Sequence, residues 1–112
     1  MEIKIEANNC IITVLSPFLF RREVSRLAET LEEYSKFKIG INMDNVIDCS
    51  VDFIEMLERF NNINLYNIAS DISAILYKMG LDKRINLYNS EIDFMSSSHR
   101  LLNRNLKLVR IH

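Results

Sequence analysis

The sequence predicts an α/β domain with a mostly parallel β-sheet that is covered by about four helices. Short segments in which apolar residues alternate with polar ones are followed by longer segments in which apolar residues recur every three or four positions. The length of 112 residues fits one domain, and 48% hydrophobic with 26% charged residues is typical of a globular protein. Two Gly and one Pro are too few for an all-β barrel or a glycine-rich phosphate-binding loop.

The chain begins with a predicted β-hairpin. Apolar residues occupy every second position in 3–5 and again in 12–14, which predicts two strands. Asn8-Asn9 provides the turn between them, and Pro17 closes the second strand. A helix follows, because apolar residues recur at spacings of 4, 3, 4 and 3. This apolar stripe consists of Phe20, Val24, Leu27, Leu31 and Tyr34.

Strands then alternate with helices along the chain. The elements predicted after the first helix are a strand at 38–43, a loop at 45–50, a helix at 53–60, a strand at 63–66, a helix at 68–79 and a strand at 84–88. The candidate caps of the helix after the loop are Asp48, Cys49 and Ser50. The helix at 68–79 has one apolar face, formed by Ile68, Ile72, Ile75, Leu76 and Met79, and Gly80 is expected to end it as its C-cap. Ser90 opens a fourth helix with a capping box that extends to Asp93, and the apolar positions of this helix are Ile92 and Met95. The order is therefore β-β-α-β-α-β-α-β-α, which predicts a parallel sheet with an antiparallel hairpin at one side.

Residues 96–112 are expected to follow the domain at 1–95 as a basic C-terminal extension, with 106–111 as a candidate final strand. The basic residues of this segment are Arg100, Arg104, Lys107 and Arg110, and it contains no acidic residue. No aromatic residues interleave the basic ones, so we do not expect a nucleic acid as partner.

Several kinds of protein are excluded by what the sequence lacks. No apolar run approaches the roughly 20 residues that span a bilayer, and no signal peptide is visible, so we expect a cytoplasmic protein without a membrane span. Cys10 and Cys49 do not form a disulfide framework, and His99 and His112 lack the spacing of metal ligands. We therefore expect no metal, no cofactor and no catalytic residue, with Cys10 in the core.

The order and length of these elements resemble the STAS domain family, named after sulfate transporters and anti-sigma factor antagonists. The most specific stretch is 39–51, in which a hydrophobic strand, an Asp-containing turn, a hydrophobic pair and a second Asp precede a helix. A second similar stretch is 63–68, which is followed by a helix that ends Lys78-Met79-Gly80-Leu81. The resemblance covers the chain up to about residue 95.

In the anti-sigma factor antagonists of this family, the first Ser after the second Asp is phosphorylated by a serine kinase that is itself the anti-sigma factor. Here Asp48 matches the Asp, and Cys49 stands at the position of the phosphorylated Ser. Ser50 matches the next hydroxyl residue, and Val51 replaces a Gly. The resemblance therefore implies an altered phosphorylation switch, unless Ser50 has taken it over.

Two kinds of partner follow from the resemblance. The first is an anti-sigma factor or serine kinase-like protein, which a non-enzymatic bacterial module would bind to regulate transcription by partner switching. The residues implied for the partner-binding loop are Asp44, Asn45, Asp48, Cys49, Ser50 and Asp52. The alternative is a STAS subunit that binds the ATPase of an ABC-type lipid or anion transporter, since other members serve transporters and need no phosphorylated Ser. The resemblance also allows a homodimer of the chain.

Cys49 and the acidic residues near it allow further interpretations. A thiol at a helix N-terminus can have a lowered pKa and act as a redox switch, but Cys49 is more simply a near-isosteric replacement for Ser in a cap. Asp44, Asp48 and Asp52 recur at a spacing of four, as some metal ligands do. No His or further acid joins them, so we expect them to serve as caps and solvent-exposed residues.

Overall fold

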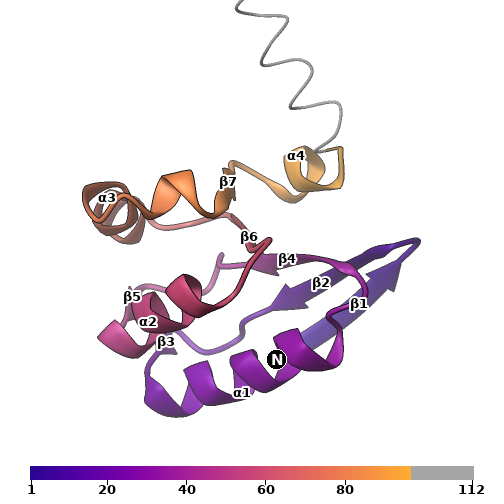
Figure 1. Ribbon diagram of the computed structural model, residues 1–112, viewed down its shortest axis with the longest axis horizontal. Coiled ribbons are helices and arrows are strands. Elements are labelled where there is room, and N and C mark those ends of the chain that lie inside the picture. The colour runs from indigo at the N-terminus through magenta and orange to yellow at the C-terminus, as the bar shows by residue number, and fades with distance from the viewer. Residues whose placement is uncertain (97–112) are drawn as a thin grey trace, which may run out of the picture.

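The main β-sheet has five strands in the order β1-β2-β4-β6-β7 (Figure 1). The computed structural model describes residues 1–96. The strands of this sheet are β1 (Glu2–Glu6), β2 (Asn9–Thr13), β4 (Lys38–Asn42), β6 (Asn64–Tyr66) and β7 (Asn86–Tyr88). β1 and β2 pair antiparallel, whereas β2, β4, β6 and β7 pair parallel. The predicted hairpin and the mostly parallel sheet are confirmed.

Helices connect the parallel strands, because each parallel pair needs a crossover. The helices are α1 (Arg21–Glu33), α2 (Val51–Arg59), α3 (Ser70–Lys78), the short 3-10 helix η1 (Leu81–Lys83), and α4 (Glu91–Met95). Gly80 ends α3 as predicted, in the left-handed conformation with φ 73°. Ser90 caps α4 as predicted, because its hydroxyl accepts a hydrogen bond from the N–H of Asp93. Within residues 1–96, the predicted α/β fold with about four helices is confirmed.

A second sheet has only two short parallel strands, β3 (Phe18–Leu19) and β5 (Asp48–Cys49). The sequence predicts a loop at 45–50, and this prediction is wrong at its end, where β5 forms. A strand of two residues is too short to show an alternating pattern, so the sequence carries no periodicity from which to infer it. This small sheet joins the segment before α1 to the segment before α2.

The larger apolar cluster lies between the main sheet and the first three helices. α1 buries Val24, Leu27 and Leu31 on it, which are the central three residues of the predicted stripe. Other members that are fully buried include Cys10, Ile12 and Ile41 from the sheet and Phe53, Leu57 and Leu76 from the helices. Cys10 is therefore a core residue, as predicted.

A smaller apolar cluster lies on the opposite face of the main sheet. Successive residues of a strand point to opposite faces, so Ile11 and Tyr66 face away from the larger cluster. Phe94 of α4 packs on them together with Tyr88. The sequence predicts Ile92 as an apolar position of this helix, but its side chain is 77% exposed, and Phe94 is the buried residue instead.

Three smaller details also correct the prediction. The hairpin turns at Ala7 and Asn8, one residue before the predicted position, and Ala7 adopts a left-handed φ of 55°. Phe20 and Ile75, which the periodicity places on buried helix stripes, are exposed. Phe20 is the N-cap residue and has an extended backbone, so the helical period of α1 does not direct its side chain. Ile75 lies at the edge of its stripe, where a period of 3.6 residues does not decide between core and surface.

The predicted extension after residue 96 and the candidate strand at 106–111 lie outside the described residues. Within residues 1–96, the longest helix is the 13-residue α1, and no helix is long and apolar enough to cross a membrane.

Candidate partner-binding site

The segment that enters α2 is attached to the segment that enters α1. The N–H of Ile47 donates a hydrogen bond of 2.8 Å to the carbonyl oxygen of Pro17, and the N–H of Ser50 donates one of 3.0 Å to that of Leu19. These bonds flank the β3–β5 pair and hold residues 47–50 against 17–19. Of the residues implied for the partner-binding loop, Asp48 and Cys49 are therefore part of a small ordered sheet, and Ser50 directly follows it.

The turn after β4 is fixed by side-chain amides. The Asn42 Oδ1 atom accepts a hydrogen bond of 3.1 Å from the N–H of Asp44. The Asn45 Nδ2 atom donates one of 3.2 Å to the carbonyl oxygen of Val14. Val46, the next residue, is buried in the larger cluster. Asp44 itself is exposed, so the turn presents its carboxylate to solvent.

The start of α2 differs from the predicted cap. Ser50 occupies the N-cap position, but its hydroxyl accepts no hydrogen bond from the first turn of the helix. The hydroxyl donates instead to Oδ2 of Asp52 at 3.1 Å. Asp48 binds a backbone donor outside the helix, because its Oδ1 accepts a hydrogen bond of 2.8 Å from the N–H of Cys49. Asp48 and Ser50 thus order this loop by local hydrogen bonds without capping α2 with their side chains.

Cys49 packs against the larger apolar cluster and is half-buried. Burial raises the pKa of its thiol, and the nearby Asp48 carboxylate raises it further, because both disfavour the thiolate. A reactive thiol at a helix N-terminus needs a lowered pKa. The environment of Cys49 therefore favours a protonated thiol that replaces Ser in shape and opposes a redox switch.

Four apolar side chains in and next to the two segments 17–19 and 47–50 are exposed, and we call them the loop patch: Phe18, Phe20, Ile47 and Val51. Ile47 and Val51 are 63% and 66% exposed. The rings of Phe18 and Phe20 stack with a centroid distance of 5.3 Å. Since β3 pairs with β5, the loop patch combines residues from two segments that are about 30 positions apart in the sequence.

The loop patch includes residues that the sequence does not identify as part of the partner-binding site. The periodicity assigns Phe20 to a helix core, and Phe18 and Ile47 belong to no predicted element. Two aromatic residues around a single Leu, directly after Pro17, are the signal that could have indicated an exposed pair. The pairing of β3 with β5 could not be read from the sequence.

The predicted acidic residues do not gather into one site. Asp44 and Asp48 are exposed, and Asp52 is half-buried beside Ser50. Among residues 1–96, no three His, Cys, Asp or Glu side chains lie close enough to hold a metal ion.

A comparison with solved structures finds the same fold in a much larger protein. The murine Solute Carrier 26 family member A9 anion transporter, in its inward-facing state, matches with a TM-score of 0.67 at 16% sequence identity. The match covers 87% of this chain and 18% of the transporter chain. No protein-family model and no curated protein sequence matches the chain. The likeness establishes the fold class and is consistent with a STAS-like domain.

Proposed function

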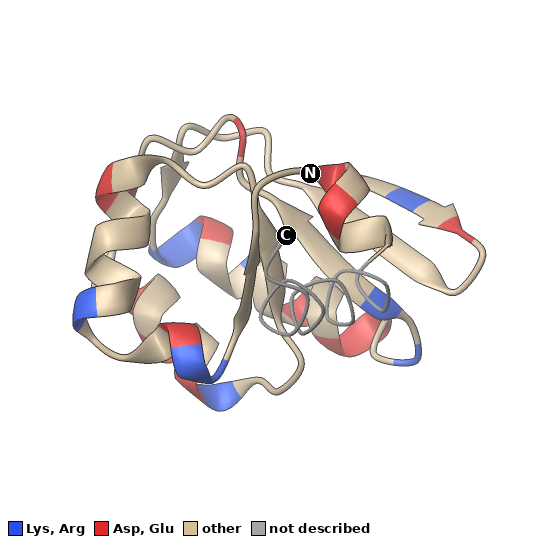
Figure 2. Ribbon diagram, turned by 90° about the horizontal axis from the view of Figure 1, so that it is seen from above, with Lys and Arg blue, Asp and Glu red and all other residues tan. Residues whose placement is uncertain are grey.

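We propose that the chain is a non-enzymatic protein-binding module of the STAS type. Its partner is an anti-sigma factor or serine kinase-like protein, and partner binding regulates transcription. The observation that carries this proposal is the loop patch. Exposed apolar groups that cluster on a monomer, surrounded by polar residues, are typical of protein–protein interaction sites. Lys and Arg positions are interspersed with Asp and Glu positions over the described fold (Figure 2), which favours a protein over a nucleic acid as partner.

The partner surface comprises the loop patch and the exposed residues around it. Asp44, Asp48 and the half-buried Asp52 add negative charge, and Asn45 lies on the same turn. A complementary partner surface is therefore apolar in its centre and basic at its rim. Residues 1–95 form the binding domain in this proposal, and the basic segment 96–112 extends from it.

Phosphorylation is not the expected switch. Cys49 is no substrate for an ordinary serine kinase, and the Ser50 hydroxyl donates to Asp52. A phosphate on Ser50 would add about −1.5 to −2 charges beside two carboxylates, which repel it. We expect no phosphate to be transferred when the chain is incubated with a cognate kinase and ATP, and we expect a Ser50→Ala variant to bind its partner like the wild type. If Ser50 is phosphorylated and partner binding is then lost, Ser50 acts as the phosphorylation switch after all.

The second candidate function is a subunit that binds the ATPase of an ABC-type transporter. The observation that favours it is the fold neighbour, which is itself an anion transporter. This function needs no phosphorylated Ser, in agreement with Cys49 at that position. The same loop patch would then contact the ATPase.

Direct titration distinguishes the two functions. The chain is titrated by calorimetry with a kinase-like anti-sigma factor and with an ABC-type ATPase from its source genome. The protein that binds identifies the function, and a folded chain that binds neither contradicts both. The double variant Phe18→Ser with Ile47→Ser should weaken binding by about tenfold or more.

The matched control is Ile92→Ser, because Ile92 is the most exposed large apolar side chain among residues 1–96 and lies on α4, away from the loop patch. It should leave affinity unchanged. Equal losses in both variants would mean that the loop patch is not the interface.

A further inference from the structure

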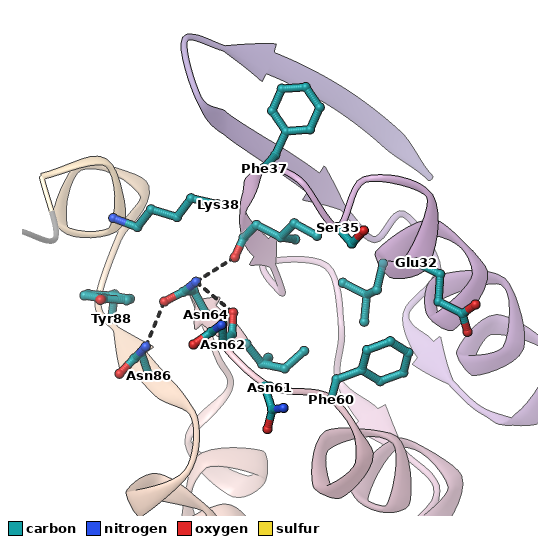
Figure 3. A pocket seen from close by; sticks show the side chains of 13 residues that line it. Glu32, Ser35, Phe37, Lys38, Phe60, Asn61, Asn62, Asn64, Asn86 and Tyr88 are labelled. Carbon is teal, nitrogen blue, oxygen red and sulfur yellow. Dashed lines mark hydrogen bonds between the residues drawn. The ribbon is translucent and has the colours of Figure 1, made fainter.

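A pocket of about 620 Å³ lies at the amino ends of β4, β6 and β7 (Figure 3). The loop patch follows the carboxyl end of β4, so the pocket lies at the opposite end of the sheet. Its walls also include the residues after the C-terminal ends of α1 and α2. The volume is within the range of roughly 300–1,000 Å³ that is usual for small-molecule sites.

The buried Asn64 divides the pocket into two sides. Its Nδ2 atom donates to the carbonyl oxygen of Ile39 at 2.8 Å, and its Oδ1 atom accepts from Nδ2 of Asn86 at 3.0 Å. Figure 3 shows Lys38 and Asn86 on one side of Asn64, and Glu32 and Phe60 on the other. The hydrogen bonds of Asn64 are made within the protein, so this residue shapes the pocket and leaves ligand contacts to its neighbours.

Lys38 is a half-buried cation without a carboxylate partner in the described part of the chain. Its Nζ atom lies 3.4 Å from the carbonyl oxygen of Phe94 and 5.1 Å from the centroid of that ring. Both ion pairs of the described residues belong to Lys4. The ammonium is partly desolvated by burial, and this lowers the pKa of Lys38. An anion that enters the pocket would supply the missing counter-charge.

The far side of the pocket is apolar at its wall and negative at its rim. Leu31 and Ile63 are buried there, and Phe60 is half-buried. The C-terminal ends of α1 and α2 present partial negative charge, and Glu32 adds a carboxylate. These groups disfavour a second negative charge on the ligand. The two sides together select a molecule with one anionic end and an apolar body.

We propose that this pocket binds a small organic monocarboxylate. The carboxylate pairs with the ammonium of Lys38 and accepts the second Nδ2 hydrogen of Asn86. The apolar body extends past Asn64 to Phe60 and Leu31. This site is separate from the proposed partner surface, so the two can be tested independently.

The test is a titration of the full chain with three probes of equal length, followed by backbone amide chemical shifts. Hexanoate should shift the amides of β4 and β7 in a saturable manner. 1-Hexanol, which lacks the charge, and adipate, which adds a second carboxylate, should bind at least about tenfold more weakly. Equal binding of hexanol and hexanoate, or no saturable shift with hexanoate, would overturn the proposal.

Single substitutions test whether the ammonium of Lys38 binds the carboxylate of the ligand. Lys38→Met keeps the apolar stem and should weaken hexanoate binding by about tenfold or more, whereas Lys36→Met removes an exposed ammonium two residues away and should change nothing. Asn86→Ala, at an exposed position, should weaken binding several-fold and serves as the deciding variant if Lys38→Met does not fold. Unchanged affinity in a folded Lys38→Met variant would refute the site.

Discussion

The ring of Phe94 lies directly against the backbone of Gly40. A Cβ atom at residue 40 would be 2.5 Å from Cε2 of that ring, which is closer than real side-chain contacts allow. Tyr66 stacks on Phe94 at a centroid distance of 5.9 Å, and Tyr88 meets it edge-on at 6.1 Å. The ring is therefore confined on several sides, and the missing side chain of Gly40 creates the space in which α4 attaches to the sheet.

A Gly40→Ala substitution should displace Phe94 and loosen α4. Overpacking of a confined core position costs about 1–3 kcal/mol, and we expect a loss of this size in the free energy of unfolding measured with urea. The same substitution in a Phe94→Ala background should cost much less, because the clashing atoms are gone. Equal costs in both backgrounds would show that the contact is not the cause.

Gly80 tests a different property of glycine. Its φ of 73° is left-handed, and a Cβ atom there would meet nothing within 4 Å. Gly80→Ala should therefore destabilise the protein by about 1 kcal/mol through backbone strain alone. Gly80→Asn should cost less, since Asn tolerates this conformation better. Identical urea midpoints for the Ala and Asn variants would contradict this explanation.

The two glycines show where sequence reasoning succeeds and where it fails. Gly80 is predictable, because it directly follows an apolar helix pattern and Gly commonly ends helices in the left-handed conformation. The role of Gly40 is not, because it depends on Phe94, which is 54 residues away and belongs to a helix of only five residues. Such a helix is too short for its period to distinguish Ile92 from Phe94.

The candidate site also combines residues that the sequence identifies with residues that it does not. The segment from Asp44 to Asp52 follows from the resemblance to a family, and it runs from the turn after β4 through β5 into the first turn of α2. Phe18 and Phe20 join them only through the pairing of β3 with β5, a long-range contact that no local pattern reports. Strands of two residues are specified by their tertiary surroundings more than by their own sequence.

Tyr66 should resist ionisation at high pH. It is buried, and its hydroxyl donates a hydrogen bond of 3.0 Å to Oε1 of Glu91. Burial raises the pKa of Tyr66, and the Glu91 carboxylate raises it further. The unfolded chain then loses this proton at lower pH than the folded protein does. Stability from this residue is complete below the ordinary tyrosine pKa of about 10 and falls above it by about 1.4 kcal/mol per pH unit.

A Tyr66→Phe variant should lack this part of the alkaline loss of stability, whereas Tyr77→Phe, at an exposed position on α3, should retain it. Urea unfolding of the three proteins at several values between about pH 9 and 11.5 measures the difference. Parallel pH profiles for wild type and Tyr66→Phe would refute the assignment. In addition, Tyr66→Phe should cost about 1.5–3 kcal/mol at neutral pH, because it removes a hydrogen bond to the carboxylate.

Cys49 should react with an alkylating agent more slowly than a free cysteine at neutral pH. Its thiol has a raised pKa because of burial and of Asp48, and only the thiolate reacts. The midpoint of the rate against pH should therefore lie above that of ordinary cysteine. Asp48→Asn removes the negative charge but keeps an oxygen that can accept from the N–H of Cys49, so it should lower this midpoint without loosening the loop.

Cys49→Ser provides the control, because it leaves Cys10 as the remaining thiol. Cys10 is fully buried and its pKa is raised by burial, so this variant should react only after denaturation. A midpoint for Cys49 below that of free cysteine would overturn the assignment and support a thiol switch. A midpoint that does not change in Asp48→Asn would instead mean that burial alone holds the thiol protonated.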